Sequence, residues 1–69
     1  LQNVAFADLV RLAEALGFRL ERVSGSHHIF SHPLLPELLN LQQVRGQAKP
    51  YQIRQLLRQV ERHDLRLEE

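Results

Sequence analysis

The chain has 69 residues, of which 43% are hydrophobic and 25% are charged, and its formal net charge at pH 7 is +1. This length predicts one small domain over residues 1–69 whose core is too small for a deep substrate cavity, and the composition excludes a disordered chain. The absence of cysteine excludes disulfides and thiolate nucleophiles, and so small a net charge does not by itself indicate a nucleic-acid partner.

The sequence lacks the features of a membrane or exported protein. No apolar run approaches the roughly 20 residues that a membrane-spanning helix needs. The first residues also do not resemble a signal peptide. We therefore expect a cytoplasmic protein without a membrane partner.

The first third of the chain predicts a helix followed by a strand. Apolar residues recur at helical spacing, at Phe6, Leu9, Val10, Ala13 and Leu16. Gly17 follows as a stop signal, so the spacing predicts a helix over residues 4–16. Residues 18–23 alternate with a period near two, which predicts a strand with Phe18 and Leu20 on one face.

The middle of the chain predicts the rest of a small sheet. Residues 24–26 form a turn in which glycine supplies conformational freedom, and residues 27–32 form the returning strand of a hairpin. Pro33 and Pro36 bound a loop, and residues 38–44 form a candidate third strand. Residues 45–49 are expected to be a polar connection.

Pro50 then opens a second helix at the first-turn position that proline tolerates. This helix is expected to end near residues 63–64. Its buried residues are predicted to be Ile53, Leu56, Leu57 and Val60, and its exposed helix formers Gln52, Gln55 and Gln59. The predicted fold is α+β, a three-stranded antiparallel sheet covered on one face by two helices.

The histidines in the segment Gly-Ser-His-His-Ile-Phe (residues 25–30) are the first candidates for chemistry. A metal site is the weaker interpretation, because neighbours on a strand point to opposite faces and His27 and His28 cannot readily chelate one ion. His28 and His32 share a face but would lie about 13 Å apart, too far for ligands near 2 Å from a zinc ion. We expect no metal and no cofactor.

Acid–base catalysis by histidine is the second interpretation. Imidazole can donate or accept a proton at neutral pH. RNA carries its own nucleophile, the 2′-hydroxyl, so its cleavage needs only proton transfer and stabilisation of charge on the phosphate. A surface histidine beside a few cations is enough for that reaction. The competing interpretation is that His27 and His28 are ordinary exposed residues of a strand.

Cations on the second helix give weak support to an RNA partner. Arg54, Arg58 and Arg62 recur at four-residue spacing along one polar stripe. Lys49 stands just before the helix N-terminus, where free N–H groups and the helix dipole favour phosphate. Lys49, Arg54 and Arg58 are candidates to hold a nucleic-acid backbone. A solvated helix face would have the same pattern.

The order and spacing of four short motifs resemble the HicA toxins of prokaryotic toxin–antitoxin systems. The motifs are Leu16-Gly17-Phe18, Gly25-Ser26-His27, His32-Pro33 and Lys49-Pro50. The resemblance extends from about Val4 to Leu65. It implies a double-stranded-RNA-binding-domain-like fold of helix, three strands and helix. It also implies a ribosome-independent mRNA interferase that is silenced by a HicB antitoxin.

The resemblance also assigns roles to residues. The histidine after the Gly-Ser pair is the catalytic one in the family, which is His27 here. Gly25 and Ser26 would shape the turn that presents it, and His28 would have a supporting or structural part. Lys49 matches the basic position that leads into the last helix, whereas the roles of Arg54 and Arg58 are predicted from helical spacing alone.

The function that we expect is therefore that of a metal-independent endoribonuclease toxin that cleaves mRNA in the cytoplasm. In this interpretation His27 acts as general base or general acid, and either His28 or water fills the other role. Two alternatives remain open. One is a non-catalytic RNA-binding module of the same fold, and the other is a protein-binding domain that uses the apolar loop at Leu34-Leu35.

Overall fold

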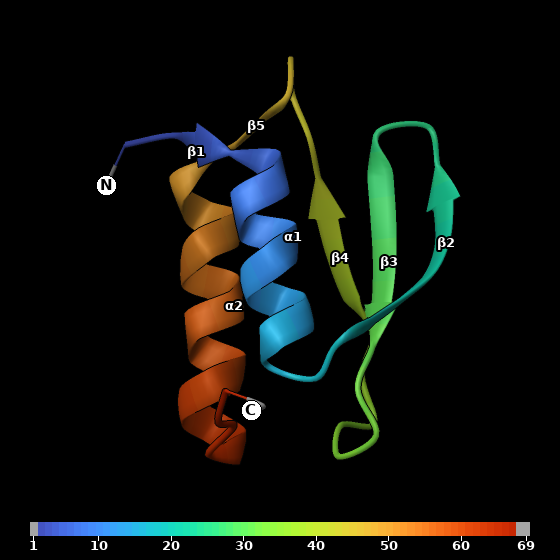
Figure 1. Ribbon diagram of the computed structural model, residues 1–69, viewed down its shortest axis with the longest axis vertical. Helices are drawn as coiled ribbons and strands as arrows, with labels where there is room; N and C mark the ends of the chain where they lie inside the picture. The colour runs from blue at the N-terminus through green and yellow to red at the C-terminus, as the bar shows by residue number, and fades with distance from the viewer. Residues whose placement is uncertain (1, 68–69) are drawn as a thin grey trace.

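Two helices lie side by side against one face of a three-stranded sheet (Figure 1). The computed structural model describes residues 2–67. Its elements in chain order are β1 (Val4–Ala5), α1 (Phe6–Ala15), β2 (Arg19–Ser24), β3 (His27–Ser31), β4 (Leu39–Gln42), β5 (Gln47–Ala48) and α2 (Pro50–His63). The predicted α+β class and its helix–three strands–helix order are confirmed.

The main sheet is antiparallel, with the strand order β2-β3-β4. A two-residue turn joins β2 to β3, and Ser24 pairs with His27 at its base. Gly25 has a φ of +60° and Ser26 does not have a positive φ, which is the pattern of the type II′ turn that suits a tight hairpin. The hairpin is thus confirmed, although β3 ends at Ser31 instead of residue 32.

A second, two-stranded sheet was not predicted. Val4 and Ala5 were assigned to the first helix, but they pair with Gln47 and Ala48, and α1 begins only at Phe6. The Phe6 N–H donates a hydrogen bond to the Gly46 carbonyl at 2.9 Å. The polar connection over residues 45–49 therefore contains a strand, which gives the chain before α1 a partner and shortens the predicted helix.

The core lies between the helices and the inner face of β3 and β4. Its members are Phe6, Leu9, Ala13, Leu16, Phe18, Phe30, Leu39, Leu41, Ala48, Leu56 and Leu65. Ile53 and Val60, which were predicted to be buried, pack against this core and are half-buried.

Leu57, which was predicted to be buried, is exposed, and so is Leu20 on the inner face of the sheet. Leu57 is 45% exposed, because it follows the fully buried Leu56 by about 100° around the helix and so lies off the core face. Leu20 is 47% exposed although it pairs with Phe30 on the inner face. Its strand, β2, is the edge of the sheet farthest from the helices, so nothing covers it (Figure 1).

Gln52 was predicted to be an exposed helix former, and this prediction is wrong. Its side chain is 1% exposed and lies at the free edge of β4. The Gln42 N–H donates to Oε1 of Gln52 at 2.6 Å, and Nε2 of Gln52 donates to the Gln42 carbonyl at 2.5 Å. The amide thus takes the place of a neighbouring strand, and it fixes the distance between α2 and β4.

His32 was predicted at the end of a strand and instead lies buried in the loop that follows β3. The Leu34 N–H donates to its Nδ1 at 3.0 Å, so its Nε2 carries the proton and donates to the Leu16 carbonyl at 2.9 Å. Its ring also lies edge-on to Phe18, with ring centroids 4.9 Å apart. His32 therefore joins the loop to the end of α1.

Candidate functional site

His27 is the first residue of β3 and lies on the sheet face that points away from the core. Its Nδ1 is 3.0 Å from Oδ1 of Asn40, a residue of the neighbouring strand β4. Because the Asn40 oxygen can only accept, Nδ1 is the donor of this bond, and Nε2 is the ring nitrogen that has no hydrogen-bond partner within residues 2–67. The residue is half-buried, so the side chain is partly enclosed by its neighbours and partly open to solvent.

A shallow hollow of about 260 Å³ surrounds this edge of the ring. Three elements form it: β3 supplies His27, β4 supplies Asn40 and Gln42, and α2 supplies Tyr51 and Gln55. All of these side chains carry hydrogen-bonding groups. Such a lining suits a polar ligand that crosses the surface better than an apolar molecule that needs enclosure.

The turn before His27 is connected to β4 by two hydrogen bonds. The Gln43 N–H donates to the Ser26 carbonyl at 3.1 Å, and Nε2 of Gln42 donates to Oγ of Ser26 at 3.1 Å. Together with the positive φ of Gly25, these bonds set the position at which β3 begins. Gly25 and Ser26 therefore form the turn that immediately precedes His27 and is hydrogen-bonded to Gln42 and Gln43.

His28 lies on the opposite face of the sheet from His27. Its ring packs against Phe6 of α1, with ring centroids 4.8 Å apart. Within residues 2–67, its buried Nδ1 has no hydrogen-bond partner. The structure therefore separates the two histidines, and the contacts of His28 are those of a packing residue.

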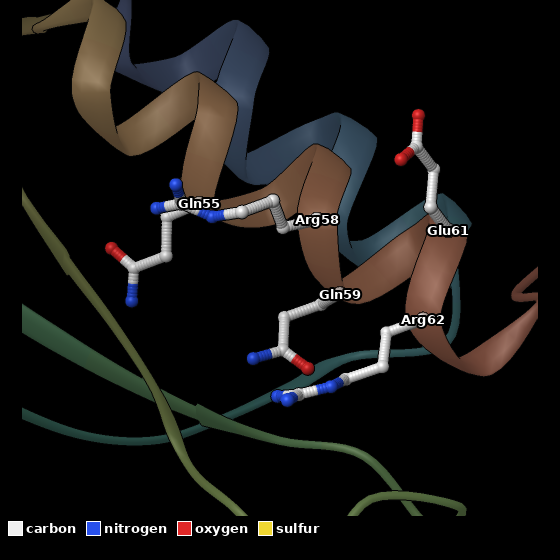
Figure 2. Close-up of a pocket in the computed structure, with 5 residues that line it drawn as sticks. All are labelled: Gln55, Arg58, Gln59, Glu61 and Arg62. Carbon is white, nitrogen blue, oxygen red and sulfur yellow. The ribbon is translucent and has the colours of Figure 1, made fainter.

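The predicted cations lie at different places along α2. Lys49 is the N-cap residue of the helix and lines a hollow with Asn3, Val44, Arg45 and Gln47. Arg58 lines another hollow, of about 520 Å³, together with Gln55, Gln59, Glu61 and Arg62 (Figure 2). Arg54 is exposed and lines none of these three hollows. Of these three cations, only Arg58 lines a hollow that shares a residue, Gln55, with the hollow around His27.

Sequence reasoning missed several residues around His27. The alternation Leu39-Asn40-Leu41-Gln42 carried a usable signal, since it places Asn40 and Gln42 together on the polar face of a strand. Arg22 is exposed on the edge strand β2, where it pairs with Ile29 and so shares the face of His27. The proximity of Tyr51 and Gln55 to His27 had no local signal, because it depends on how α2 docks beside β4.

Comparison with known protein families gave one match. The family described as HicA toxin of bacterial toxin–antitoxin matches residues 6–61 of the 69-residue chain. The chain belongs to the HicA toxin family. This HicA protein is therefore the toxin of a toxin–antitoxin pair, and it has an antitoxin as its partner. Comparisons with curated proteins and with solved structures gave no match.

Within residues 2–67, no three side chains of histidine, aspartate or glutamate gather in a group that could hold a metal ion. In the same part of the chain, neither helix has the length and apolar character needed to cross a membrane.

Proposed function

We propose that this HicA toxin is a metal-independent endoribonuclease that cleaves mRNA in the cytoplasm and thereby inhibits translation. Its partner in this proposal is a HicB-type antitoxin. The observation that carries the proposal is the environment of His27, whose Nδ1 is hydrogen-bonded to Asn40 and whose side chain lines a polar hollow at the surface. A histidine held in this way can exchange a proton with a large, flexible substrate.

The proposed reaction uses the nucleophile that RNA itself supplies. Nε2 of His27 accepts the proton of a 2′-hydroxyl as its oxygen attacks the adjacent phosphorus. The bond from phosphorus to the 5′-oxygen breaks, leaving a 2′,3′-cyclic phosphate on one fragment and a 5′-hydroxyl on the other. The departing oxygen needs a proton in return. Water is the better donor, because His28 lies on the other face of the sheet against Phe6.

Cations hold the RNA backbone and offset the charge that develops on the phosphate. We assign this role to Lys49, Arg54 and Arg58, of which Arg58 lines a hollow that shares Gln55 with the His27 hollow. Lys49 stands at the start of α2, where the side chain and the helix dipole act on a phosphate together.

The test is cleavage of a labelled mRNA in the presence of EDTA by the parent protein and by its His27→Ala and His28→Phe variants. Circular dichroism establishes that all three are folded. We expect the parent and His28→Phe to cut the RNA and His27→Ala not to cut it. If the folded parent binds RNA without cutting it, the protein is a non-catalytic RNA-binding module and the proposal is wrong.

A further inference from the structure

The hollow around His27 and a second hollow on α2 have one lining residue in common. Gln55 lines both of them. The second hollow is lined by Gln55, Arg58, Gln59, Glu61 and Arg62 (Figure 2). Four of these five residues recur at spacings of three and four, so they form one side of the helix. From Gln55 to Arg62 this side extends about 10 Å along the helix axis.

The side chains of this surface point mainly in one direction. Figure 2 shows Gln55, Gln59 and Arg62 extending from α2 toward the side of the sheet, whereas Glu61 points the other way. We call the continuous surface made by Tyr51, Gln55, Arg58, Gln59 and Arg62 the α2 track. It begins beside His27 and ends near the last turn of α2.

The α2 track carries two arginines, and Glu61 is the acidic residue that lines the same hollow. The ion pairs found within residues 2–67 are Arg11 with Asp8 and Arg66 with Asp64, and neither involves the track. Arg58 and Arg62 are exposed and have no carboxylate within ion-pair distance in that part of the chain. Two adjacent free guanidinium groups favour a polyanion.

The track also has unused hydrogen-bonding capacity. The Gln55 and Gln59 side-chain amides hydrogen-bond to no other described side chain or backbone group; Oε1 of Gln59 is buried, so the Nε2 group of that amide is the part open to a ligand. This contrasts with Gln52 on the same helix, whose amide is fully engaged by Gln42. An amide offers both a donor and an acceptor, which is the combination that reads the edge of a nucleobase.

Tyr51 supplies the remaining feature, an aromatic surface. It is 50% exposed and lies in the His27 hollow one turn of helix before Gln55. An exposed ring beside cationic groups is the arrangement on which proteins stack the bases of a single strand. The phenol ring is therefore placed beside the nucleotide whose 2′-hydroxyl His27 would deprotonate.

We propose that the α2 track binds single-stranded RNA that continues from the scissile phosphate at His27. A base stacks on Tyr51, the Gln55 and Gln59 amides contact base edges, and Arg58 and Arg62 hold the phosphates. An unpaired strand fits because its base edges are free to be read. It can also place the 2′-oxygen, the phosphorus and the departing oxygen in line. This inference rests on the proposed cleavage of RNA at His27.

The test measures binding separately from cleavage. The probe is a short fluorescent RNA of mixed sequence whose 2′-hydroxyls are all methylated, so that it has no nucleophile. A duplex of the same length is the comparison. Fluorescence anisotropy gives the Kd over a series of salt concentrations for the parent, for the double variant Arg58→Gln/Arg62→Gln and for Arg11→Gln. Arg11 is a matched control, because it is an exposed helix arginine that is paired with Asp8.

We expect the parent to prefer the single strand. The double variant should bind it about tenfold more weakly, and the slope of log K against log salt should fall by about 1.4, for two phosphates at about 0.7 each. Arg11→Gln should bind as the parent does. Tyr51→Ala should also lose about tenfold in affinity, and Tyr51→Phe should restore it, because stacking needs the ring and not the hydroxyl.

The two proposals fail in different ways. If the double variant and Tyr51→Ala bind the single strand as tightly as the parent, the α2 track is not an RNA-binding surface, whatever the activity of His27. An effect of these variants on antitoxin binding alone would likewise overturn the inference. If they weaken binding while the parent leaves unmethylated RNA uncut, the track stands and the proposed nuclease activity is wrong.

Discussion

His27 and Asn40 lie diagonally across β3 and β4, with 3.0 Å between Nδ1 of the ring and Oδ1 of the amide. In the strand register His27 pairs with Gln42 and Asn40 pairs with Ile29, so the bond crosses the ladder on its outer face. It restrains the ring and fixes the proton on Nδ1. Nε2, the atom that we assign to proton transfer, is the ring nitrogen that this bond leaves free.

Replacing Asn40 by leucine should therefore slow RNA cleavage without unfolding the protein. The Asn40 side chain is exposed, so the loss of stability should be small, but the imidazole becomes free to rotate and to change tautomer. We expect the rate to fall about 10- to 100-fold, a part of the 10²- to 10⁴-fold that a positioned acid–base group contributes. Initial cleavage rates measure this effect, and ¹⁵N NMR of the ring reports the tautomer.

Asn40→Asp is the matched variant, because its carboxylate can still accept the Nδ1 proton. It should keep the tautomer of the parent, in contrast to Asn40→Leu. If Asn40→Leu cleaves RNA at the parent rate while the ring shows mixed tautomers, the hydrogen bond does not position His27 for the reaction.

His28 should be replaceable by phenylalanine. Its ring already packs on Phe6, and its buried Nδ1 has no partner within the described residues. Removing a buried polar atom that lacks a hydrogen bond relieves a cost of about 1–3 kcal/mol, so the free energy of unfolding should stay the same or rise. Urea denaturation measures it. A folded His28→Phe protein that no longer cleaves RNA would show that His28 takes part in the chemistry.

Much of the fold was predictable because it follows from local patterns. The helical spacing of apolar residues, and the signals at Gly17 and Pro50, depend only on residues that are close together in the sequence. The short pairing of Val4 and Ala5 with Gln47 and Ala48 was missed, since its two halves are far apart in the sequence. Two apolar residues of such a strand look the same as the first turn of a helix.

The candidate site was predictable only in part, for a similar reason. His27 follows a glycine turn and could be singled out along the chain. Gln52 and Gln55 look alike in the sequence, yet one is buried at the edge of β4 and the other lines the hollow beside His27. Only the docking of α2 against the sheet distinguishes them, and no local pattern of side chains encodes that contact.

The turn glycines allow a prediction that separates stability from activity. Gly25 and Gly46 have φ values of +60° and +76°, and a Cβ atom added at either would have nothing within 4 Å. Alanine at either position should thus cost about 1–2 kcal/mol of conformational energy and no steric clash. Urea denaturation should show similar losses for Gly25→Ala and Gly46→Ala.

Cleavage should distinguish the two variants. Gly25 precedes His27 by two residues in the turn that begins β3, whereas Gly46 lies in the turn before β5. At a temperature where both variants remain folded, only Gly25→Ala should cleave RNA more slowly. Equal cleavage rates would mean that the Gly25 turn does not present the catalytic ring.

Gln52→Leu should be the most destabilising of these changes. Leucine has a similar volume but leaves the Gln42 N–H and carbonyl without the partners that lie at 2.6 and 2.5 Å in the parent. The loss of two hydrogen bonds with partly buried groups should cost about 2–4 kcal/mol of unfolding free energy in urea. Gln55→Leu on the same helix removes no hydrogen bond to the protein and should change stability by less than about 0.5 kcal/mol. If both variants are equally stable, the Gln52 amide does not hold α2 against β4, and another contact must set the width of the hollow beside His27.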